Sequence, residues 1–466
     1  MGRYLVLGLG KSGLSTTRFL RRHNAAVKVA DTRARLPDIE ALTDQYPDLD
    51  IHLGDLPMAL LEDVDQLVIS PGLSPAHPLV QAAKQKGIQV IGDIELFCRQ
   101  AQAPIIAITG TNAKSTVVTL IADIINDAGF KVALGGNIGI PVLDLLDNAE
   151  GEPDFYVLEL SSFQLETTYS LKSKIAAVLN VTPDHMDRYA DFASYTQAKQ
   201  RIYAHCEWAL YNRDDEATRP SQNLSSPDRK TKRMSFGLQA AVEDDVISYN
   251  LLNNDDGDSW LAQGQDAVFP VRDLKLSGVH NHINCLAALA VSDVLGINRS
   301  SVQKTLRNFR GLAHRCEWVT DIGHVRWIND SKGTNVGSTL AALRGYADAY
   351  SGKIVLLLGG VSKEADFTPL CQMITQHVKI VIVYGKDAAK IQKDLAGVTC
   401  PVTDVDDFDL LVKRAHYEAG ESGLVLFSPA CASFDMFKNF EKRGDEFKKR
   451  VHDLKHGLIQ STEIIS

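Results

Sequence analysis

Short apolar runs rich in β-branched residues alternate with segments of helical periodicity along almost the whole chain. Runs of strand type fall at residues 4–8, 27–31, 66–70, 105–109, 155–159, 176–180, 325–329, 354–359, 380–385 and 424–428. Strands separated by helix-length segments are typical of parallel sheets whose faces are covered by helices. The pattern therefore predicts an α/β fold.

The same pattern divides the chain into three predicted domains. At 466 residues the chain is too long for one hydrophobic core. A first β–α–β series closes near residue 92, and a fresh series begins after Gly311. Residues 213–270 are rich in Asn, Asp, Ser and Gly, which predicts loops or a small antiparallel addition. We expect a Rossmann-like domain (1–92), a P-loop-type mononucleotide-binding domain (93–311) and a Rossmann-like C-terminal domain (312–466).

A polar loop with one lysine follows the strand predicted at 105–109. Residues 110–116 read Gly-Thr-Asn-Ala-Lys-Ser-Thr, and a helical pattern follows. A loop between a strand and a helix aims backbone N–H groups and the helix dipole at an anion, so this segment predicts a phosphate site. The pattern departs from the usual motif at Ala113, which we expect to start the helix, where glycine is not required. The alternative is an ordinary turn with a solvated lysine.

A second glycine-rich loop lies at the N-terminus. Gly8, Gly10 and Gly13 form G-x-G-x-x-G between a strand and a helix, and Asp31 ends the next strand. This pattern is typical of dinucleotide binding, but other nucleotides use the same geometry, and the glycines alone are also compatible with a purely structural turn.

Three further residues are candidates for metal and reacting groups. Glu159 ends a predicted strand, and His185 follows the next one, so both are expected at the same sheet edge. Lys199 falls on the apolar stripe of a predicted helix. A snorkelling lysine keeps its ammonium in water, whereas a buried one loses its proton more readily and can add CO₂ to form a carbamate. A loop histidine is equally compatible with a solvated position.

Composition narrows the class of protein. The formal net charge is -9, with no basic stripe, which argues against nucleic-acid binding. No apolar run has the length of a membrane span, and the N-terminus looks like a first strand. The seven cysteines are scattered and form no C-x-x-C pair, which fits reduced thiols. We therefore expect a cytoplasmic protein without membrane or nucleic-acid partners.

Together these segments resemble the Mur ligases over essentially the whole chain. The matching segments are residues 8–13, 110–116, 135–139, 158–166, 180–188, 280–284, 314–315, 329–332, 358–360 and 428–440. Residues 433–440 resemble the members that add D-glutamate to UDP-N-acetylmuramoyl-L-alanine. The resemblance implies an ATP-dependent ligase of cytoplasmic peptidoglycan precursor synthesis, in which the alanyl carboxylate becomes an acyl phosphate and D-glutamate then attacks it. It also implies a monomer.

The resemblance assigns roles residue by residue. ATP is expected at Gly110, Thr111, Asn112, Ala113, Lys114, Ser115, Thr116, Asn281, Asn284, Arg315, Asp330 and Lys332. The UDP-substrate is expected at Lys11, Ser12, Asp31, Thr32, Arg33, Gly72, Asn137, Ser161 and His185. D-glutamate is expected at Thr334, Lys363, Ser433, Phe434 and Phe440. Two Mg²⁺ ions are expected at Ser115, Glu159, His185 and a carbamylated Lys199, and the catalytic residues are Lys114, Glu159, His185, Lys199 and Arg315.

Two other functions remain open on the residues alone. An NAD(P)-dependent oxidoreductase would explain the first glycine loop and Asp31, but not residues 110–116 or the C-terminal motifs. A non-catalytic nucleotide-binding regulator would need neither Lys199 nor the Ser433 region.

Overall fold

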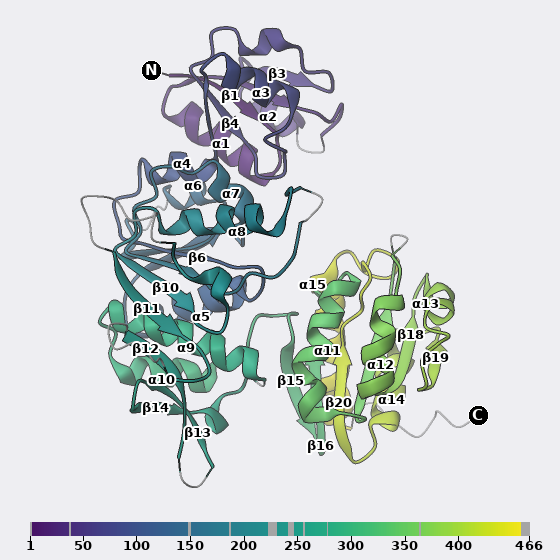
Figure 1. Cartoon of the computed structure of the whole chain (residues 1–466). Helices are drawn as coiled ribbons and strands as arrows, with labels where there is room; N and C mark the ends of the chain where they lie inside the picture. The colour runs from purple at the N-terminus through teal and green to yellow at the C-terminus, as the bar shows by residue number, and fades with distance from the viewer. Residues whose placement is uncertain are drawn as a thin grey trace. The chain divides into compact units, whose positions relative to one another are not determined.

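The computed structural model describes residues 2–36, 39–147, 151–185, 188–221, 231–240, 247–254, 257–276, 278–362 and 365–457. The chain forms two compact units, Met1–Arg272 with Ile283–Leu306, and Asp273–His282 with Arg307–Ser466 (Figure 1). Within the described ranges, no helix is both long and apolar enough to cross a membrane.

The first unit begins with a five-stranded parallel sheet in the order β3-β2-β1-β4-β5. Its strands are β1 (Arg3–Leu7), β2 (Ala26–Asp31), β3 (Asp50–Leu53), β4 (Gln66–Ile69) and β5 (Gln89–Ile91). The helices along this part of the chain are α1 (Lys11–Arg22), α2 (Ile39–Gln45), α3 (Pro78–Gln85), α4 (Asp93–Cys98) and the 3₁₀ turn Met58–Leu61. The strand order reverses between β1 and β4, and such a switch point opens a crevice at the carboxyl ends of the strands.

A nine-stranded sheet forms the rest of the first unit, in the order β14-β13-β12-β11-β10-β9-β6-β8-β7. Its strands are β6 (Ile105–Thr109), β7 (Val132–Gly136), β8 (Phe155–Glu159), β9 (Ile175–Val178), β10 (Trp208–Asn212), β11 (Lys232–Phe236), β12 (Ile247–Asn253), β13 (Ser259–Gln263) and β14 (Asp266–Pro270). Helices α5 (Lys114–Asp127), α6 (Val142–Leu145), α7 (Ser162–Glu166), α8 (Phe192–Gln200), α9 (Val279–Val294) and α10 (Arg299–Asn308) follow in the chain, with 3₁₀ turns at Arg201–Tyr203, Glu216–Thr218 and Val271–Asp273. The central strand β6 is buried along its whole length.

The second unit holds a six-stranded sheet in the order β15-β16-β20-β17-β18-β19, in which only β15 pairs antiparallel among the described strands. Its strands are β15 (Glu317–Ile322), β16 (His324–Asn329), β17 (Ile354–Gly359), β18 (Val378–Tyr384), β19 (Val402–Val405) and β20 (Ser422–Phe427). The helices are α11 (Val336–Tyr350), α12 (Cys371–His377), α13 (Ala388–Asp394), α14 (Phe408–Ala419) and α15 (Phe440–Lys455), with a 3₁₀ turn at Thr368–Leu370.

Strand β17 shows how this second sheet is buried on both faces. Ile354, Leu356 and Leu358 join a core cluster with side chains from α11, α12 and α13, whereas the alternate residues Val355 and Leu357 join one with α14 and α15. Successive strand residues point to opposite faces, so a strand covered by helices on both sides reads as one continuous apolar run.

The predicted strands are confirmed, most of them to within two residues at either end. The predicted antiparallel addition is also present, as β12 pairs antiparallel with β13 and β13 with β14. These strands do not form a separate sheet, however. Strands β10, β11 and β12 are parallel neighbours of β9, so the addition continues the central sheet at its edge. The predicted domain limits at residues 92 and 311 stay predictions.

Candidate functional site

The first glycine loop lies at the carboxyl end of β1 and leads directly into α1. A Cβ atom at Gly13 would stand 1.8 Å from the carbonyl oxygen of Gly8, and Gly8 itself has φ +94. Only glycine meets both demands without displacing the backbone. The Oγ of Ser70 donates to the same Gly8 carbonyl at 2.6 Å and joins the loop to the end of β4. The glycines are thus required by close backbone approach.

Asp31, at the end of β2, is hydrogen-bonded to the glycine loop and to Arg33. Its carboxylate accepts hydrogen bonds from the backbone N–H of Leu9 at 2.7 Å and from the guanidinium of Arg33 at 2.8 and 2.9 Å. Burial opposes the ionisation of Asp31, but the bonds from Arg33 and Leu9 outweigh it and hold its pKa at about 2. Asp31 is therefore ionised at neutral pH and fixes the orientation of Arg33.

A cavity of about 480 Å³ opens above these groups. Its lining includes seven of the residues predicted for the UDP-substrate, namely Lys11, Ser12, Asp31, Thr32, Arg33, Gly72 and Asn137. The cavity lies where the five-stranded and the nine-stranded sheets of the first unit meet, because Gly136–Asn137 comes from the end of β7. A cleft of this volume with a few convergent polar groups is a typical small-molecule site. Ser161 and His185 are not among its lining residues.

The lysine loop has the predicted position between β6 and the helix α5. The helix begins at Lys114, and Ala113 is its N-cap residue with φ +63 and ψ -1. The prediction that Ala113 starts the helix was wrong, because Ala113 precedes it in a left-handed conformation, which alanine adopts with some strain and glycine would adopt more readily. The loop is held by Asn180, whose Oδ1 accepts from the N–H of Asn112 and whose Nδ2 donates to the Asn112 carbonyl.

Two lysine side chains converge on this loop. The Nζ of Lys114 donates to the carbonyls of Gly110 and Thr111, both at 2.9 Å, and the Nζ of Lys199 donates to the same Gly110 carbonyl at 2.8 Å. Lys199 is only 2% exposed. Burial, together with the positive charge of Lys114, lowers the pKa of Lys199 to about 7. The snorkelling alternative is therefore excluded for Lys199.

Glu159 lies at the carboxyl end of β8, and only one of its two carboxylate oxygens has a hydrogen-bond partner among the described residues. Its Oε1 accepts from the Nδ2 of Asn137 at 2.8 Å, while its buried Oε2 has no hydrogen-bond partner among the described residues. Buried carboxylate oxygens are normally paired, and one left open at a strand end fits a hard cation. The buried hydroxyl-bearing Ser115 lies in the first turn of α5. The donor set of oxygens suits Mg²⁺.

His185 lies in the loop after β9, with φ +55 and a half-exposed ring. The ring centroid is 4.8 Å from that of Phe163 and 6.4 Å from that of Tyr195. The carboxylate of Asp184 is 3.6 Å from the His185 Nε2. Aromatic contacts on two sides hold the ring near the lysine loop, since the hydroxyl of Tyr195 also contacts the Thr111 Oγ1 at 3.1 Å.

Sequence reasoning missed Tyr195 and Gln164. Gln164 lines the cavity and forms a capping box with Ser161, in which the Ser161 Oγ accepts from the Gln164 N–H and the Gln164 Oε1 accepts from the Ser161 N–H. The spacing Ser-x-x-Gln is a recognised helix-start signal and was available in the sequence. Nothing in the sequence pointed to the Tyr195 contact with Thr111, which depends on how α8 packs.

The residues predicted for the adenine side lie on α9. Asn281 and Asn284 are buried, 8% and 5% exposed. Asn281 is assigned to the second unit and Asn284 to the first.

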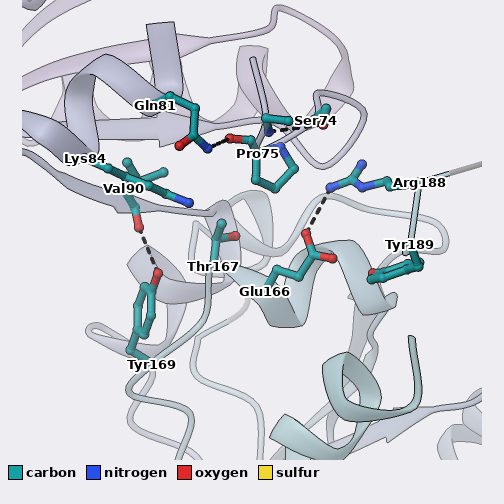
Figure 2. Close-up of a pocket in the computed structure, with 11 residues that line it drawn as sticks. Ser74, Pro75, Gln81, Lys84, Val90, Glu166, Thr167, Tyr169, Arg188 and Tyr189 are labelled. Carbon is teal, nitrogen blue, oxygen red and sulfur yellow. Dashed lines mark hydrogen bonds and ion pairs between the residues drawn. The ribbon is translucent and has the colours of Figure 1, made fainter. Parts of the chain in front are cut away.

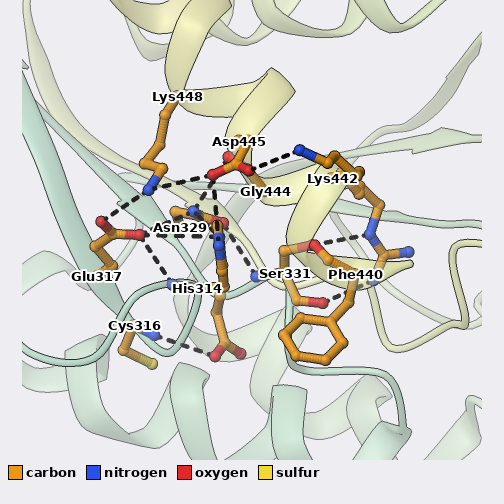
Figure 3. A network of polar contacts seen from close by, with 12 residues as sticks. His314, Cys316, Glu317, Asn329, Ser331, Phe440, Lys442, Gly444, Asp445 and Lys448 are labelled. Carbon is orange, nitrogen blue, oxygen red and sulfur yellow. Dashed lines mark hydrogen bonds and ion pairs between the residues drawn. The ribbon is translucent and has the colours of Figure 1, made fainter. Parts of the chain in front are cut away.

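The second unit contains a polar network beside the predicted Arg315, Asp330 and Lys332 (Figure 3). The carboxylate of Asp330 accepts from the Cys316 N–H at 3.1 Å and from the Ser428 Oγ at 2.6 Å, and burial raises its pKa to about 6. The Lys332 Nζ lies 5.6 Å from the ring centroid of Phe440. Two residues flanking Arg315, His314 and Cys316, have positive φ values of +62 and +45.

The residues predicted to bind D-glutamate differ in how far they are exposed to solvent. Ser433 is buried and its carbonyl accepts from the N–H of Phe437 at 2.8 Å, whereas the Phe434 ring is 70% exposed. Phe440 starts α15, and its carbonyl accepts from the Ser331 Oγ. Thr334 is partly buried in the loop before α11. Lys363 lies outside the described residues.

Three family models match successive parts of the chain. The Mur ligase MurD-like N-terminal domain matches residues 2–92, the Mur ligase middle domain matches residues 108–292, and the Mur ligase glutamate ligase domain matches residues 314–431.

Individual relatives cover nearly the whole chain. A UDP-N-acetylmuramoylalanine–D-glutamate ligase from Legionella pneumophila (strain Paris) is 44% identical over 451 residues, 97% of this chain and 99% of that protein. One from Nitrosococcus oceani is 44% identical over 450 residues, 97% and 96% of the two chains. The MurF ligase of Thermotoga maritima, solved in complex with ADP, has the same fold with a TM-score of 0.56 at 15% identity, over 97% of this chain and 96% of that one. The chain belongs to the Mur ligase family.

Proposed function

We propose that this protein joins UDP-N-acetylmuramoyl-L-alanine to D-glutamate in an amide bond, with ATP converted to ADP and phosphate. The observation that carries the proposal is the convergence of Lys114, Lys199 and the open carboxylate oxygen of Glu159 on one sheet edge, within the same unit as the 480 Å³ cavity. The near full-length relatives carry the names of enzymes with this activity. The cytoplasm, where nucleotide-linked precursors and ATP are available, is the proposed location.

In this proposal the cavity holds the UDP group. Arg33, fixed by Asp31, and Lys11 supply positive charge, while Thr32, Ser12 and Gly72 supply polar groups at the carboxyl ends of β1, β2 and β4. Asn137 spans the two parts of the site, because it lines the cavity and donates to Glu159. The sugar and alanyl end would extend from Asn137 toward Ser161 and His185.

The ATP phosphates would be held by the backbone N–H groups at the start of α5 and by Lys114. By the family resemblance, Asn281, Asn284, Arg315, Asp330 and Lys332 are proposed as further contacts of ATP. The alanyl carboxylate attacks the γ-phosphorus and displaces ADP, which gives an acyl phosphate. The D-glutamate amine then attacks the acyl carbon, loses a proton and expels phosphate. Each step brings anions together, so cations fixed where charge develops lower the barrier most.

Two Mg²⁺ ions would neutralise the negative charge shared by phosphate and carboxylate oxygens, and the oxygen donors of Ser115 and Glu159 suit one of them. Ser115 and Glu159 would hold one ion, and His185 with Lys199 the other. The Lys199 amine is largely neutral at pH 7.5 because its pKa is about 7. A neutral amine adds CO₂, and the resulting carbamate replaces a cation with oxygen ligands suited to Mg²⁺.

D-glutamate would bind in the second unit. Ser433 and Thr334 offer polar groups, and Phe434 and Phe440 would contribute apolar surface and backbone N–H groups on the strength of the family resemblance. Lys363 is proposed as the partner of a glutamate carboxylate on the strength of the family resemblance alone.

The test is phosphate release from ATP and UDP-N-acetylmuramoyl-L-alanine, measured with D-glutamate, with L-glutamate and with neither. The proposal expects release that depends on D-glutamate. Equal release under all three conditions would contradict it, and reduction of NAD(P) would favour the oxidoreductase. For the carbamate, Lys199→Ala should abolish turnover and added short carboxylates should partly restore it, whereas Lys172→Ala at an exposed position should leave turnover unchanged.

A further inference from the structure

Arg188 joins three segments of the first unit that carry proposed substrate contacts. Its Nη1 donates to the carbonyl of Pro71 at 3.0 Å, and its Nη2 donates to the Glu166 carboxylate at 3.1 Å. Its guanidinium lies 3.7 Å from the centroid of the Phe163 ring. The side chain is only 14% exposed, so these contacts are largely shielded from water.

The side chain and the backbone of Arg188 together reach three parts of the proposed UDP-substrate site. Pro71 precedes Gly72 in the loop that lines the 480 Å³ cavity. Glu166 and Phe163 lie on α7, which Ser161 caps. The backbone N–H of Arg188 donates to the carbonyl of His185 at 2.9 Å, which closes the turn carrying that histidine.

Phe163 lies between the Arg188 guanidinium and the His185 ring. The Phe163 ring packs against the guanidinium, and its centroid is 4.8 Å from the centroid of the His185 ring. The planar guanidinium can lie flat on an aromatic ring while two different nitrogens donate to separate acceptors. An ammonium has no planar face, and its donors all sit on one nitrogen, so it cannot reproduce this geometry. A lysine at this position would therefore keep the charge and lose the geometry.

Arg188 also borders a second cavity of about 470 Å³, shown in Figure 2. The loop of Ser74 and Pro75 forms one side of it, and Glu166, Tyr169 and Tyr189 form another. Residues 70–73 line the first cavity and residues 74–76 the second, so the loop borders both cavities. The Gln81 Nε2 anchors its second half through the Pro75 carbonyl at 2.7 Å, and the hydrogen bond from Arg188 to Pro71 anchors its first half.

We propose that Arg188 is a positioning residue that fixes the Gly72 loop, α7 and the His185 turn in register for the muramoyl substrate. This inference rests on the proposed function. Arg188 acts through its neighbours and does not itself touch substrate. The Gly110–Thr116 loop is held mainly by Asn180 and Tyr195, which are not hydrogen-bond partners of Arg188 among the described residues, although Tyr195 also contacts the His185 ring. We therefore expect ATP binding to depend on Arg188 much less than binding of the muramoyl substrate does.

The experiment compares Arg188→Lys with Arg213→Lys. Arg213 is a matched control because it is also partly buried and donates to a main-chain carbonyl, that of Tyr249 at 3.0 Å, and to the Ser235 Oγ at 2.9 Å, and these partners lie on β12 and β11 rather than on residues 70–76, α7 or the loop of His185. Initial rates are measured with each substrate varied, and amide hydrogen exchange is measured for residues 70–76 in both variants.

For Arg188→Lys we expect a KM for UDP-N-acetylmuramoyl-L-alanine about ten- to a hundredfold higher, since a hydrogen bond from a charged donor is lost. The KM for ATP should stay within about twofold, exchange at residues 70–76 should accelerate, and Arg213→Lys should change none of these quantities. Equal increases in both KM values, an unchanged muramoyl KM, or the same loss in Arg213→Lys would each overturn the proposal.

Hydrogen exchange separates this inference from the proposed function. If the unmodified protein forms no D-glutamate product, the proposed function fails, yet the exchange rates still report whether Arg188 anchors the loop. If Arg188→Lys does not fold, Glu166→Gln releases one end of the guanidinium instead. That variant should raise the muramoyl KM and not the ATP KM, and an unchanged muramoyl KM would count against the proposal.

Discussion

Substituting Gly444 by alanine tests the packing of α15 against the network in Figure 3. Gly444 is buried on α15, and a Cβ atom there would lie 2.1 Å from the Nδ1 of His314. That nitrogen accepts from the Asn329 Nδ2 at 3.0 Å, and the His314 ring is buried. The ring must move by at least about 1 Å to reach van der Waals distance, which breaks this hydrogen bond.

The opposing energies can be compared. Alanine in a helix interior is favoured over glycine by about 1 kcal/mol. Against this stand about 1–3 kcal/mol for a buried polar group left without its partner and about 1–3 kcal/mol for overpacking. The loss outweighs the gain, so we expect Gly444→Ala to lower the free energy of unfolding of the second unit by about 2–3 kcal/mol.

The assay is urea unfolding followed by tryptophan fluorescence, with Trp208 and Trp260 replaced by phenylalanine so that the signal comes from Trp318 and Trp327 of the second unit. Trp327 is fully buried and its ring centroid is 6.1 Å from that of Phe447 on α15. Loosening of α15 should therefore change its emission.

A double-mutant cycle isolates the cause. In a His314→Ala background the ring is absent, so Gly444→Ala should become neutral or stabilising, with a coupling energy of about 3 kcal/mol between the two sites. Gly397→Ala serves as the control, because a Cβ atom at Gly397 meets nothing within 4 Å. Additive costs for Gly444 and His314, within about 0.5 kcal/mol, would refute the reasoning.

Two further predictions concern the first unit. Gly136→Ala should destabilise it and weaken nucleotide binding, because the added Cβ would lie 2.2 Å from the Glu159 carbonyl oxygen. Gly139 also has a positive φ, but a Cβ there meets nothing within 4 Å, so Gly139→Ala should cost only backbone strain. Calorimetric titration with UDP compares the two variants. Burial raises the pKa of Asp93 from 3.8 to about 6. Between pH 3.8 and about pH 6 the folded protein thus retains a proton on Asp93 that the unfolded chain loses. The free energy of unfolding therefore falls as the pH rises through this range, by about 3 kcal/mol in total. Asp93→Asn should remove this pH dependence. If the free energy of unfolding changed equally between pH 4 and pH 8 in both proteins, the raised pKa of Asp93 would be contradicted.

Much of the fold could be predicted because strands buried on both faces are continuous apolar runs, and such runs are visible without tertiary information. The position of Glu159 at a strand end was predicted in the same way. Residues 213–270 were harder, because short strands with alternating side chains do not reveal whether they pair with each other or with an existing sheet. The structure assigns β10 to β12 to the central sheet, where their partners are distant in sequence.

The candidate site, like the fold, could be predicted from the sequence only in part. The lysine loop was recognised from its strand, loop and helix, but the left-handed conformation of Ala113 was not, since it results from the geometry of chain reversal between β6 and α5. Both readings of Lys199 were compatible with its helical position. Burial beside Lys114 decided between them, and burial depends on every element packed around α8.

The sequence by itself determined the order of strands and helices, the two glycine-containing loops, and the chemical identity of the groups at the strand ends, because these depend on local periodicity and on residue type. Only the tertiary structure decided which groups share a site. It directed Lys114 and Lys199 to one carbonyl, joined Asn137 to Glu159, and linked Arg188 to Pro71, 117 residues away in the chain. Hydrogen bonds, burial and pKa values depend on distances between atoms, and those distances exist only after the sheets have formed and packed.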